Sequence, residues 1–198
     1  MTHARGLIAF ATLLLLALPL AACKGTPPQA PSAAPAMTED GVGDTDAESP
    51  TTADLRQAHL RLEDREDDVR LTDGAFTVPP PVGQATGGLD LRMLDDPVGN
   101  GDLNSDGAPD AVIAVVANTG GSGRFVYLAP YLAGGASPDP IPALFLGDRV
   151  NVLHLTIVDG RLTADLVVHG PDDPMCCPSQ AERRNFVLTA SGALTPAP

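Results

Sequence analysis

The sequence predicts an α+β domain, mainly an antiparallel β-sheet of about seven or eight strands in a meander with one short N-terminal helix. An all-β sandwich or a small barrel is the alternative. Three observations carry this prediction. Short apolar runs alternate with turns rich in Gly, Pro and Asp, the stretch AVIAVVA (111–117) is apolar throughout, and two alternating runs flank Asp159-Gly160.

Helix is predicted only at the start of the domain. The segment TADLRQAHLRLED (52–64) begins with capping residues and is rich in good helix formers. At helical spacing Leu55, His59 and Leu62 would lie roughly on one face.

Strands are predicted for the rest of the domain, at residues 75–78, 89–94, 111–117, 124–133, 141–146, 150–169 (a hairpin) and 185–190. Because AVIAVVA has no polar position, it should be a central strand covered on both faces. Pro130 cannot donate to a ladder, so it predicts an edge position or a bulge within 124–133.

The hairpin 150–169 also predicts its own register. Asp159-Gly160 is a two-residue turn signal. The resulting pairs are Ile157 with Leu162, Leu155 with Ala164, Leu153 with Leu166, Thr156 with Thr163, and His154 with Asp165. One face is then wholly apolar and the other polar, as one buried face requires. His154 and Asp165 are better explained as a cross-strand surface pair than as an acid–base pair.

The first 22 residues predict a signal peptide. Arg5 precedes an apolar run at 7–20 that is too short for a comfortable membrane span, and Leu20-Ala21-Ala22 leads directly into Cys23. This junction resembles the lipobox of bacterial lipoproteins. The resemblance implies that Cys23 is acylated and anchors the chain to a membrane, where several acyl chains hold a protein firmly. An ordinary secretory signal is the alternative.

The domain organisation follows from composition. Residues 1–22 are the predicted signal peptide, and 23–50 hold the lipidated Cys and a disordered Pro- and Ala-rich linker. Residues 51–198 are the predicted single globular domain. Lys24 follows Cys23, which under lipoprotein sorting rules permits export to an outer membrane if the cell has one. The predicted location is the bacterial cell envelope.

The charge balance narrows the possible partners. The chain has 12 Lys and Arg against 25 Asp and Glu. Such an acidic chain argues against nucleic acid and anionic lipid head groups as ligands and favours cations. Aromatic residues make up 4% of the chain and Trp is absent, so a stacking platform for bases or sugars is poorly supplied.

The stretch GDLNSDGAPD (101–110) predicts a calcium site. The expected ligands are Asp102, Asn104, Asp106, the backbone carbonyl of Ala108, and Asp110. Counted from Asp102, they match positions 1, 3, 5, 7 and 9 of an EF-hand-like loop, with Gly107 at position 6. Position 12, normally Glu, is Ile113, so binding should be weak. A metal-free loop of Asx turns is the alternative.

The acidic loop is also similar to the D-x-[DN]-x-D-G-x-x-D loops of FG-GAP/VCBS repeats. Those proteins repeat the unit, whereas here it occurs once, so no propeller is expected. The loop runs directly into the predicted buried strand 111–117. A structural role for calcium is therefore expected, and no other cofactor is predicted.

The stretch HGPDDPMCCPSQ (169–180) has adjacent cysteines, Cys176 and Cys177. Four explanations compete in an oxidising compartment. They are a vicinal disulfide that stiffens a turn, a redox-active form of that bond, a soft-metal site for copper or zinc, and intermolecular bridging. His169 and Met175 are the alternative soft-metal ligands.

Several motifs together resemble a set of uncharacterised bacterial exported proteins and lipoproteins. They are the lipobox, GDLNSDGAPDAVI, GGSGR, LGDRV and DPMCCP. The resemblance spans about residues 70–190, and a weaker one is to LppP/LprE-type lipoproteins. Neither carries a known activity, and the chain has no P-loop, H-E-x-x-H or G-x-S-x-G motif. The prediction is a non-enzymatic interaction module with an unknown protein or envelope partner. The alternative is a periplasmic redox or copper-handling lipoprotein.

Overall fold

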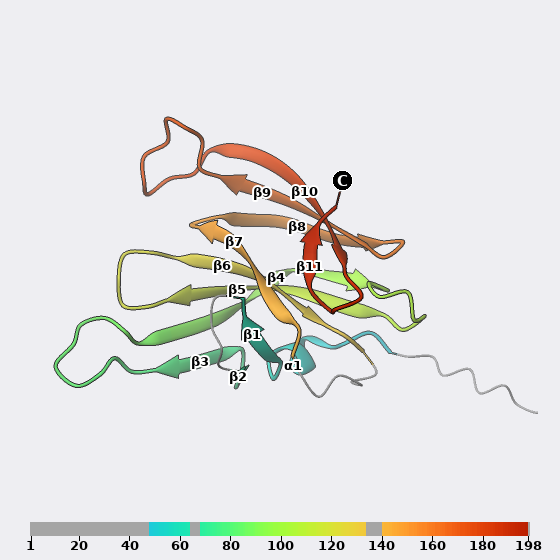
Figure 1. Cartoon of the computed structure of the whole chain (residues 1–198), viewed down its shortest axis with the longest axis horizontal. Helices are drawn as coiled ribbons and strands as arrows, with labels where there is room; N and C mark the ends of the chain where they lie inside the picture. The colour runs from blue at the N-terminus through green and yellow to red at the C-terminus, as the bar shows by residue number, and fades with distance from the viewer. Residues whose placement is uncertain (1–47, 64–67, 134–139, 198) are drawn as a thin grey trace, which may run out of the picture. The chain divides into compact units, whose positions relative to one another are not determined.

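The computed structural model describes residues 48–63, 68–133 and 140–197 (Figure 1). The chain divides into two units, Met1–Gly43 and Asp44–Pro198, and every described residue belongs to the second. The described residues form two β-sheets and one short helix, which confirms the predicted fold class and its sandwich or small-barrel variant. The predicted signal peptide, Cys23 and nearly all of the predicted linker lie outside the described residues.

The larger sheet has seven strands in the order β2-β1-β7-β6-β5-β4-β3. They are β1 (His59–Leu62), β2 (Asp68–Arg70), β3 (Ala75–Val78), β4 (Leu89–Gly101), β5 (Asp110–Asn118), β6 (Phe125–Tyr131) and β7 (Pro142–Asp148). Strands β3 to β7 form the predicted antiparallel meander, and β1 pairs with β7 in parallel. A bridge between Thr72 and Ala75 links the β2 and β3 ends, so the sheet curls into a nearly closed barrel.

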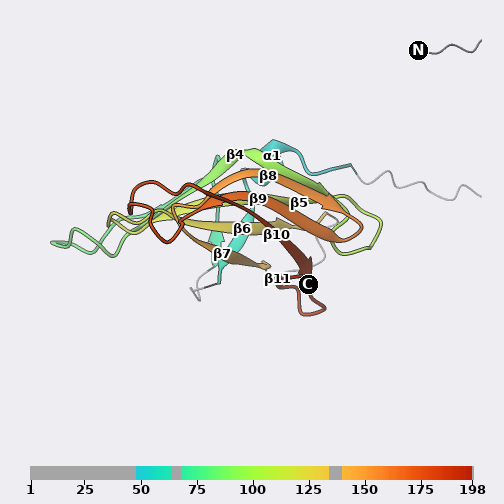
Figure 2. The same ribbon diagram turned by 90° about the horizontal axis from the view of Figure 1, so that it is seen from above.

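The smaller sheet has four antiparallel strands in the order β11-β10-β9-β8. They are β8 (Asn151–Val158), β9 (Arg161–Val168), β10 (Gln180–Leu188) and β11 (Leu194–Pro196). Figure 1 shows β8, β9 and β10 as a separate layer beside β4, β5 and β6, and in the perpendicular view of Figure 2 this layer overlies those strands. The two sheets therefore stack face to face.

Two hydrophobic cores result, and β5 contributes to both. The core between the sheets takes Val112, Ala114 and Val116, while the core inside the curled sheet takes Ala111, Ile113, Val115 and Ala117. Since successive side chains of a strand point to opposite faces, a strand covered on both faces must be apolar at every position. The predicted burial of AVIAVVA on both faces is confirmed, with residues 110–117 all buried.

The predicted helix is much shorter in the structure. Helix α1 spans only Thr52–Leu55, and its N-terminus is capped by mutual hydrogen bonds between Thr51 and Asp54. The extension of this helix to about residue 64 is wrong, because residues 59–62 form β1 instead. There Leu60 and Leu62 are buried on alternate positions, and pairing with β2 and β7 outweighs the helix propensity of the segment.

The hairpin register is confirmed in the half nearest the turn. Ile157, Leu155, Thr156 and His154 face Leu162, Ala164, Thr163 and Asp165 as predicted. Beyond this point the prediction is wrong, because Leu166 faces Val152 rather than Leu153. A bulge leaves Leu153 unpaired, and its side chain is 48% exposed. An extra residue at a bulge shifts all later pairs by one.

Strand β4 extends well beyond the predicted 89–94. The stretch DDPVGN contains turn-forming residues, yet residues 98–101 pair with 110–113 after a register shift between Met93 and Val98. This second half of β4 packs closely on β8, since a Cβ on Gly101 would lie 2.8 Å from the carbonyl oxygen of Ile157. Glycine is therefore required where the two sheets meet.

Strand β6 is internal to its sheet, so the predicted edge position is wrong for the strand as a whole. The predicted alternative, a bulge, has a counterpart in the register shift of the β6–β7 pairing between Val126 and Tyr127. Pro130 pairs with Val112 of β5, whereas the pairing of β6 with β7 ends at Leu128. The proline thus lies in the part of β6 that pairs with one neighbour only. A missing N–H is tolerated at such a position.

Candidate functional site

The acidic loop joins β4 to β5 and wraps around the carboxylate of Asp102. One oxygen of Asp102 accepts hydrogen bonds from the backbone N–H groups of Ser105 (2.6 Å) and Asp106 (3.2 Å), and the other from Gly107 (2.9 Å). Ser105 and Gly107 have φ values of 63° and 87°, a left-handed conformation that closes the loop. Backbone N–H dipoles thus balance this negative charge.

Asn104 and Asp106 form the exposed outer part of the loop. The Asn104 amide nitrogen donates to one oxygen of Asp106 (2.8 Å), and the other oxygen accepts from the N–H of Ala108 (2.8 Å). These two hydrogen bonds hold the pKa of Asp106 below its ordinary value, and the bond from the Ala108 N–H has the larger effect. These are the Asx turns of the metal-free alternative, and they leave Asp106 charged.

Asp110 points into the protein. Asp110 is fully buried, and among the described residues no other polar or charged residue is buried. One carboxylate oxygen accepts from the N–H groups of Leu103 (2.9 Å) and Asn104 (3.3 Å), and the other accepts from Ala133 (3.0 Å). Burial is the main influence on the pKa of Asp110 and raises it, while these N–H groups act in the opposite direction. Asp110 therefore ties the acidic loop to the segment after β6.

The loop offers a cation only oxygen donors, which suit a hard ion such as calcium. Among the described residues, no three His, Cys, Asp or Glu side chains are grouped as a metal site. Asp110, the fifth predicted ligand, is buried with its oxygens bonded to backbone N–H groups, so a calcium ion would rely on Asp102, Asp106, the Asn104 amide and the Ala108 carbonyl. Position 12 supplies no ligand, since the side chain of Ile113 is 0% exposed in the core.

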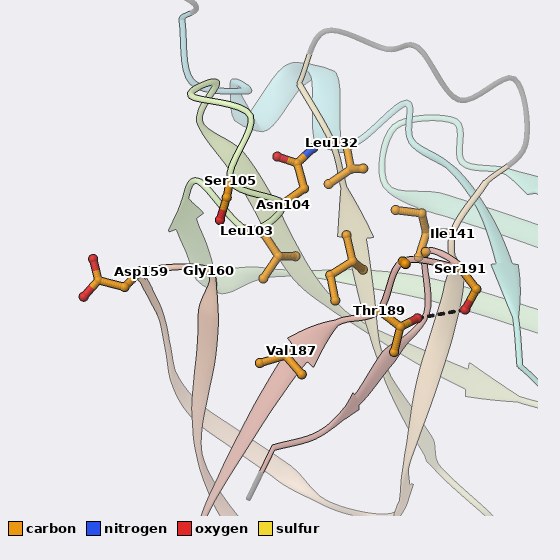
Figure 3. Close-up of a pocket in the computed structure, with 13 residues that line it drawn as sticks. Leu103, Asn104, Ser105, Leu132, Ile141, Asp159, Gly160, Val187, Thr189 and Ser191 are labelled. Carbon is orange, nitrogen blue, oxygen red and sulfur yellow. Dashed lines mark hydrogen bonds between the residues drawn. The ribbon is translucent and has the colours of Figure 1, made fainter.

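A cleft of about 660 Å³ lies beside the acidic loop (Figure 3). Its walls come from the acidic loop, the β8–β9 turn, the β10–β11 turn and the ends of β6 and β7, and include Leu103, Asn104, Leu132, Ile141 and Val187. None of the described residues that line it is a His, Cys, Lys or Arg. The Thr189 and Ser191 hydroxyls bond to each other (2.8 Å).

Glycine brings two walls of this cleft together. A Cβ on Gly160 in the β8–β9 turn would lie 3.2 Å from the hydroxyl oxygen of Ser105. The hairpin turn that was predicted from Asp159-Gly160 thus supports the acidic loop as well as reversing the chain. In Figure 3 the Asp159 side chain points away from the cleft.

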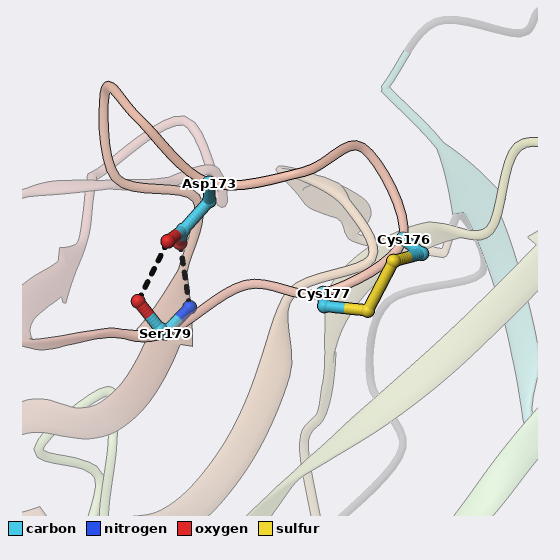
Figure 4. The surroundings of a disulfide bond; sticks show 4 residues. All are labelled: Asp173, Cys176, Cys177 and Ser179. Atoms are coloured by element: carbon cyan, nitrogen blue, oxygen red, sulfur yellow. Dashed lines mark hydrogen bonds between the residues drawn. A yellow bond between two sulfur atoms is a disulfide. The ribbon is translucent and has the colours of Figure 1, made fainter.

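The double-cysteine loop lies between β9 and β10. Cys176 and Cys177 are joined by a disulfide, and both residues are exposed. Asp173 closes the base of the loop by accepting hydrogen bonds from the N–H groups of Gly170 (2.8 Å) and Ser179 (2.7 Å) and from the Ser179 hydroxyl (2.7 Å) (Figure 4). The bond from Gly170 is the largest of the influences that lower the pKa of Asp173.

The structure does not gather the alternative soft-metal ligands. His169 is half-buried, and its Nε2 atom has no hydrogen-bond partner within the described residues. His169, Cys176 and Cys177 do not form a metal-binding group there. Met175 is 75% exposed. The exposed sulfur pair is thus held on a short loop, and Asp173, which sequence reasoning missed, is the residue that anchors it.

The predicted surface pair of His154 and Asp165 has a third member. Asp165 accepts two hydrogen bonds from the guanidinium of Arg183 on β10, at 2.6 and 3.1 Å. Arg183 is the main cause of the lowered pKa of Asp165. Because a charged arginine occupies both carboxylate oxygens, the arrangement is that of a cross-strand ion pair on the surface of the sheet.

Comparison of the chain with protein families, curated proteins and solved structures found no match. No helix in the described part of the chain has the length and apolar character that a membrane span requires.

Proposed function

We propose that the chain is a lipid-anchored, non-enzymatic binding module of the bacterial cell envelope. The lipobox-like segment ending at Cys23 supports the anchor. The observation that carries the binding role is the 660 Å³ cleft with the acidic loop as one wall. This volume is typical of small-molecule sites. The described lining combines apolar side chains with the Asn104 amide and the hydroxyls of Ser105, Thr189 and Ser191, which suits recognition through apolar contacts and hydrogen bonds. The partner is expected to come from the cell envelope.

In this proposal calcium has a structural role. Asp102, Asn104, Asp106 and the Ala108 carbonyl would hold the ion, and Asp110 would act from within as the anchor of the loop. The ion would add positive charge to the exposed carboxylates and stiffen the loop that carries Asn104 and Ser105 into the cleft wall. Calcium would thereby preserve the shape of the cleft without contacting its ligand.

Calcium is expected to raise the melting temperature of the full chain. A dissociation constant of about 10⁻⁴ M is typical of weak extracellular sites. At about 2 mM calcium, linkage then gives about 1.8 kcal/mol of stabilisation. For a chain of this size the shift is roughly 4–7 °C relative to excess chelator. Thermal melts followed by circular dichroism measure it.

A matched pair of variants tests the assignment to the loop. Asp106→Asn should remove most of the calcium-dependent shift, because the charge of a proposed ligand is lost. Asp172→Asn, an exposed aspartate outside the acidic loop, should keep the full shift. An unshifted wild-type melt, or an equal shift in Asp106→Asn, would count against calcium binding by this loop.

A second candidate function, redox or copper handling, is favoured by one observation. Cys176 and Cys177 are both exposed and anchored at the loop base by Asp173. In the redox form, a thiolate of a dithiol partner attacks one sulfur, the Cys176–Cys177 bond breaks and a mixed disulfide forms. The second thiolate of the partner then displaces the cysteine, so that the partner is oxidised to a disulfide while Cys176 and Cys177 are reduced to thiols. In the copper form, the reduced thiolates would bind Cu(I).

Thiol titration before and after mild reduction tests the second candidate. Two further thiols should become reactive after reduction, and Asp173→Ala should speed reduction several-fold because the loop base opens. Asp172→Ala is the matched control with an unchanged rate. Because the pKa of Asp173 is lowered, its anchoring is complete above the ordinary value of 3.8 and is lost as the pH falls through the lowered value. Thiols that stay inert after reductant treatment would exclude this function.

A further inference from the structure

A second, smaller cavity lies at the opposite end of β5 from the acidic loop. It has a volume of about 150 Å³, and its described lining residues are Leu62, Leu89, Ala117, Thr119, Phe125, Tyr127 and Phe145. Strand β5 begins at Asp110 and reaches the cavity at Ala117, about 23 Å further along the strand. The cavity is therefore separate from the acidic loop and from its cleft.

Aromatic side chains are concentrated at this cavity. The whole chain has only five Phe and two Tyr, yet three of these seven line it. Phe145 lies 5.2 Å from Tyr127 and 6.3 Å from Phe125 between ring centroids, with the ring planes tilted by 47° and 55°. Tilted pairs at such distances are favourable and fix ring orientation. The sequence does not reveal this cluster, because Phe145 comes from a different strand.

The strand pattern explains why the rings converge. Phe125 and Tyr127 are two residues apart on β6, so both point to the inner face of the curled sheet. On β7, Phe145 is the direct cross-strand neighbour of Tyr127. Tyr127 is 3% exposed, whereas Phe145 is 44% exposed. One wall of the cavity is thus deeply buried, and the other reaches the surface.

The size and lining of the cavity define the ligand it can hold. Apart from the hydroxyls of Thr119 and Tyr127, the described lining is aliphatic and aromatic. Such a cavity binds water poorly, and one of about 150 Å³ accepts a molecule the size of benzene. A fused two-ring compound is too large for this volume. The residues named above carry no formal charge, so an ionic ligand would be buried without a partner.

We propose that this cavity binds one small, uncharged cyclic hydrocarbon group of about six carbon atoms, preferably an aromatic ring. The ring enters past Phe145 and packs against Tyr127 and Phe125. Aliphatic contacts come from Leu62 and Leu89, and Ala117 leaves the space in which the ring sits. The proposal uses no residue of the acidic loop or of the disulfide loop, so it stands independently of the proposed function.

Benzene is the probe, added to the full chain carrying Cys23→Ser, with methyl groups followed by NMR. Saturable shifts are expected at the methyl groups of Leu62, Leu89 and Ala117, and naphthalene should give none. Ala117→Leu fills the space and should abolish the shifts. Phe145→Ala should weaken binding about tenfold, because ring–ring contacts are lost. Leu153→Ala, which truncates an exposed side chain on the other sheet, should bind as the wild type does.

The Phe145→Ala variant keeps the test decisive if Ala117→Leu does not fold, since Phe145 is partly exposed. Unchanged methyl signals of Leu162 and Leu166 in the smaller sheet report that each variant is folded. The proposal is overturned if benzene produces no saturable shift in the wild type. It is equally overturned if a folded Ala117→Leu or Phe145→Ala variant binds benzene with wild-type affinity.

Discussion

Replacing Asp110 by Asn should lower the free energy of unfolding by about 3 kcal/mol. The buried carboxylate accepts three backbone N–H groups, from Leu103, Asn104 and Ala133. Asn has the same shape but presents an NH₂ group where one oxygen was, so at least one buried N–H would face another donor. An unsatisfied buried donor and the loss of charge-assisted bonds are both costly. Urea titration measures the change, and the melting temperature should fall by roughly 6–12 °C.

The matched control is Asp106→Asn in excess chelator. Asp106 is exposed and bonds only within its own loop, so its substitution should cost less than about 1 kcal/mol. Similar losses for the two variants would contradict the role of Asp110 as the anchor. Hydrogen exchange at Ala133 gives a local check, because this amide should lose protection in Asp110→Asn while the smaller sheet keeps its protection.

Gly101→Ala should also destabilise the fold by roughly 3 kcal/mol. Gly101 has a φ of 151°, and an added Cβ would lie 2.8 Å from the carbonyl oxygen and 2.9 Å from the Cβ of Ile157. Backbone and a β-branched side chain cannot both give way, so β4 and β8 would have to separate. The free energy of unfolding from urea titration measures the effect.

Gly107→Ala separates crowding from backbone conformation. Gly107 has a φ of 87°, but a Cβ there would have no atom within 4 Å. Its cost should therefore be only the left-handed backbone penalty of about 1 kcal/mol. If Gly101→Ala were no more harmful than Gly107→Ala, the close approach of the two sheets at Gly101 would not be a real constraint on the sequence.

The parts of the fold that the sequence predicts are those whose pattern is set by immediate neighbours. AVIAVVA has no polar position and therefore fits only a strand that is covered on both faces. Asp159-Gly160 determines the hairpin through the geometry of a two-residue turn. The bulge at Leu153 escapes prediction because Val152 and Leu153 are both apolar. The hydrophobic pattern alone does not show which of the two side chains faces the core. Residues 59–62 follow good helix formers, and pairing with β2 and with the distant β7 decides that they form a strand.

The candidate site divides in the same way. The acidic loop and the cysteine pair are contiguous, so their positions are visible in the sequence. The hydrogen-bond partners of the carboxylates in the acidic loop are not visible in the sequence, because Asp110 accepts a hydrogen bond from the distant Ala133. The cleft and the aromatic cavity are assembled from strands that are distant along the chain. No local pattern marks such residues as neighbours.

Strand β5 is the shared wall of two hydrophobic cores, with Val112 on one side and Ile113 on the other. Loss of order in either core would remove the packing of one face of β5 and expose the opposite core along its whole length. Neither core can therefore unfold without the other, and the two sheets should unfold in one cooperative transition. Ligands at either end of β5 would then protect the entire domain against unfolding rather than only the end that they contact.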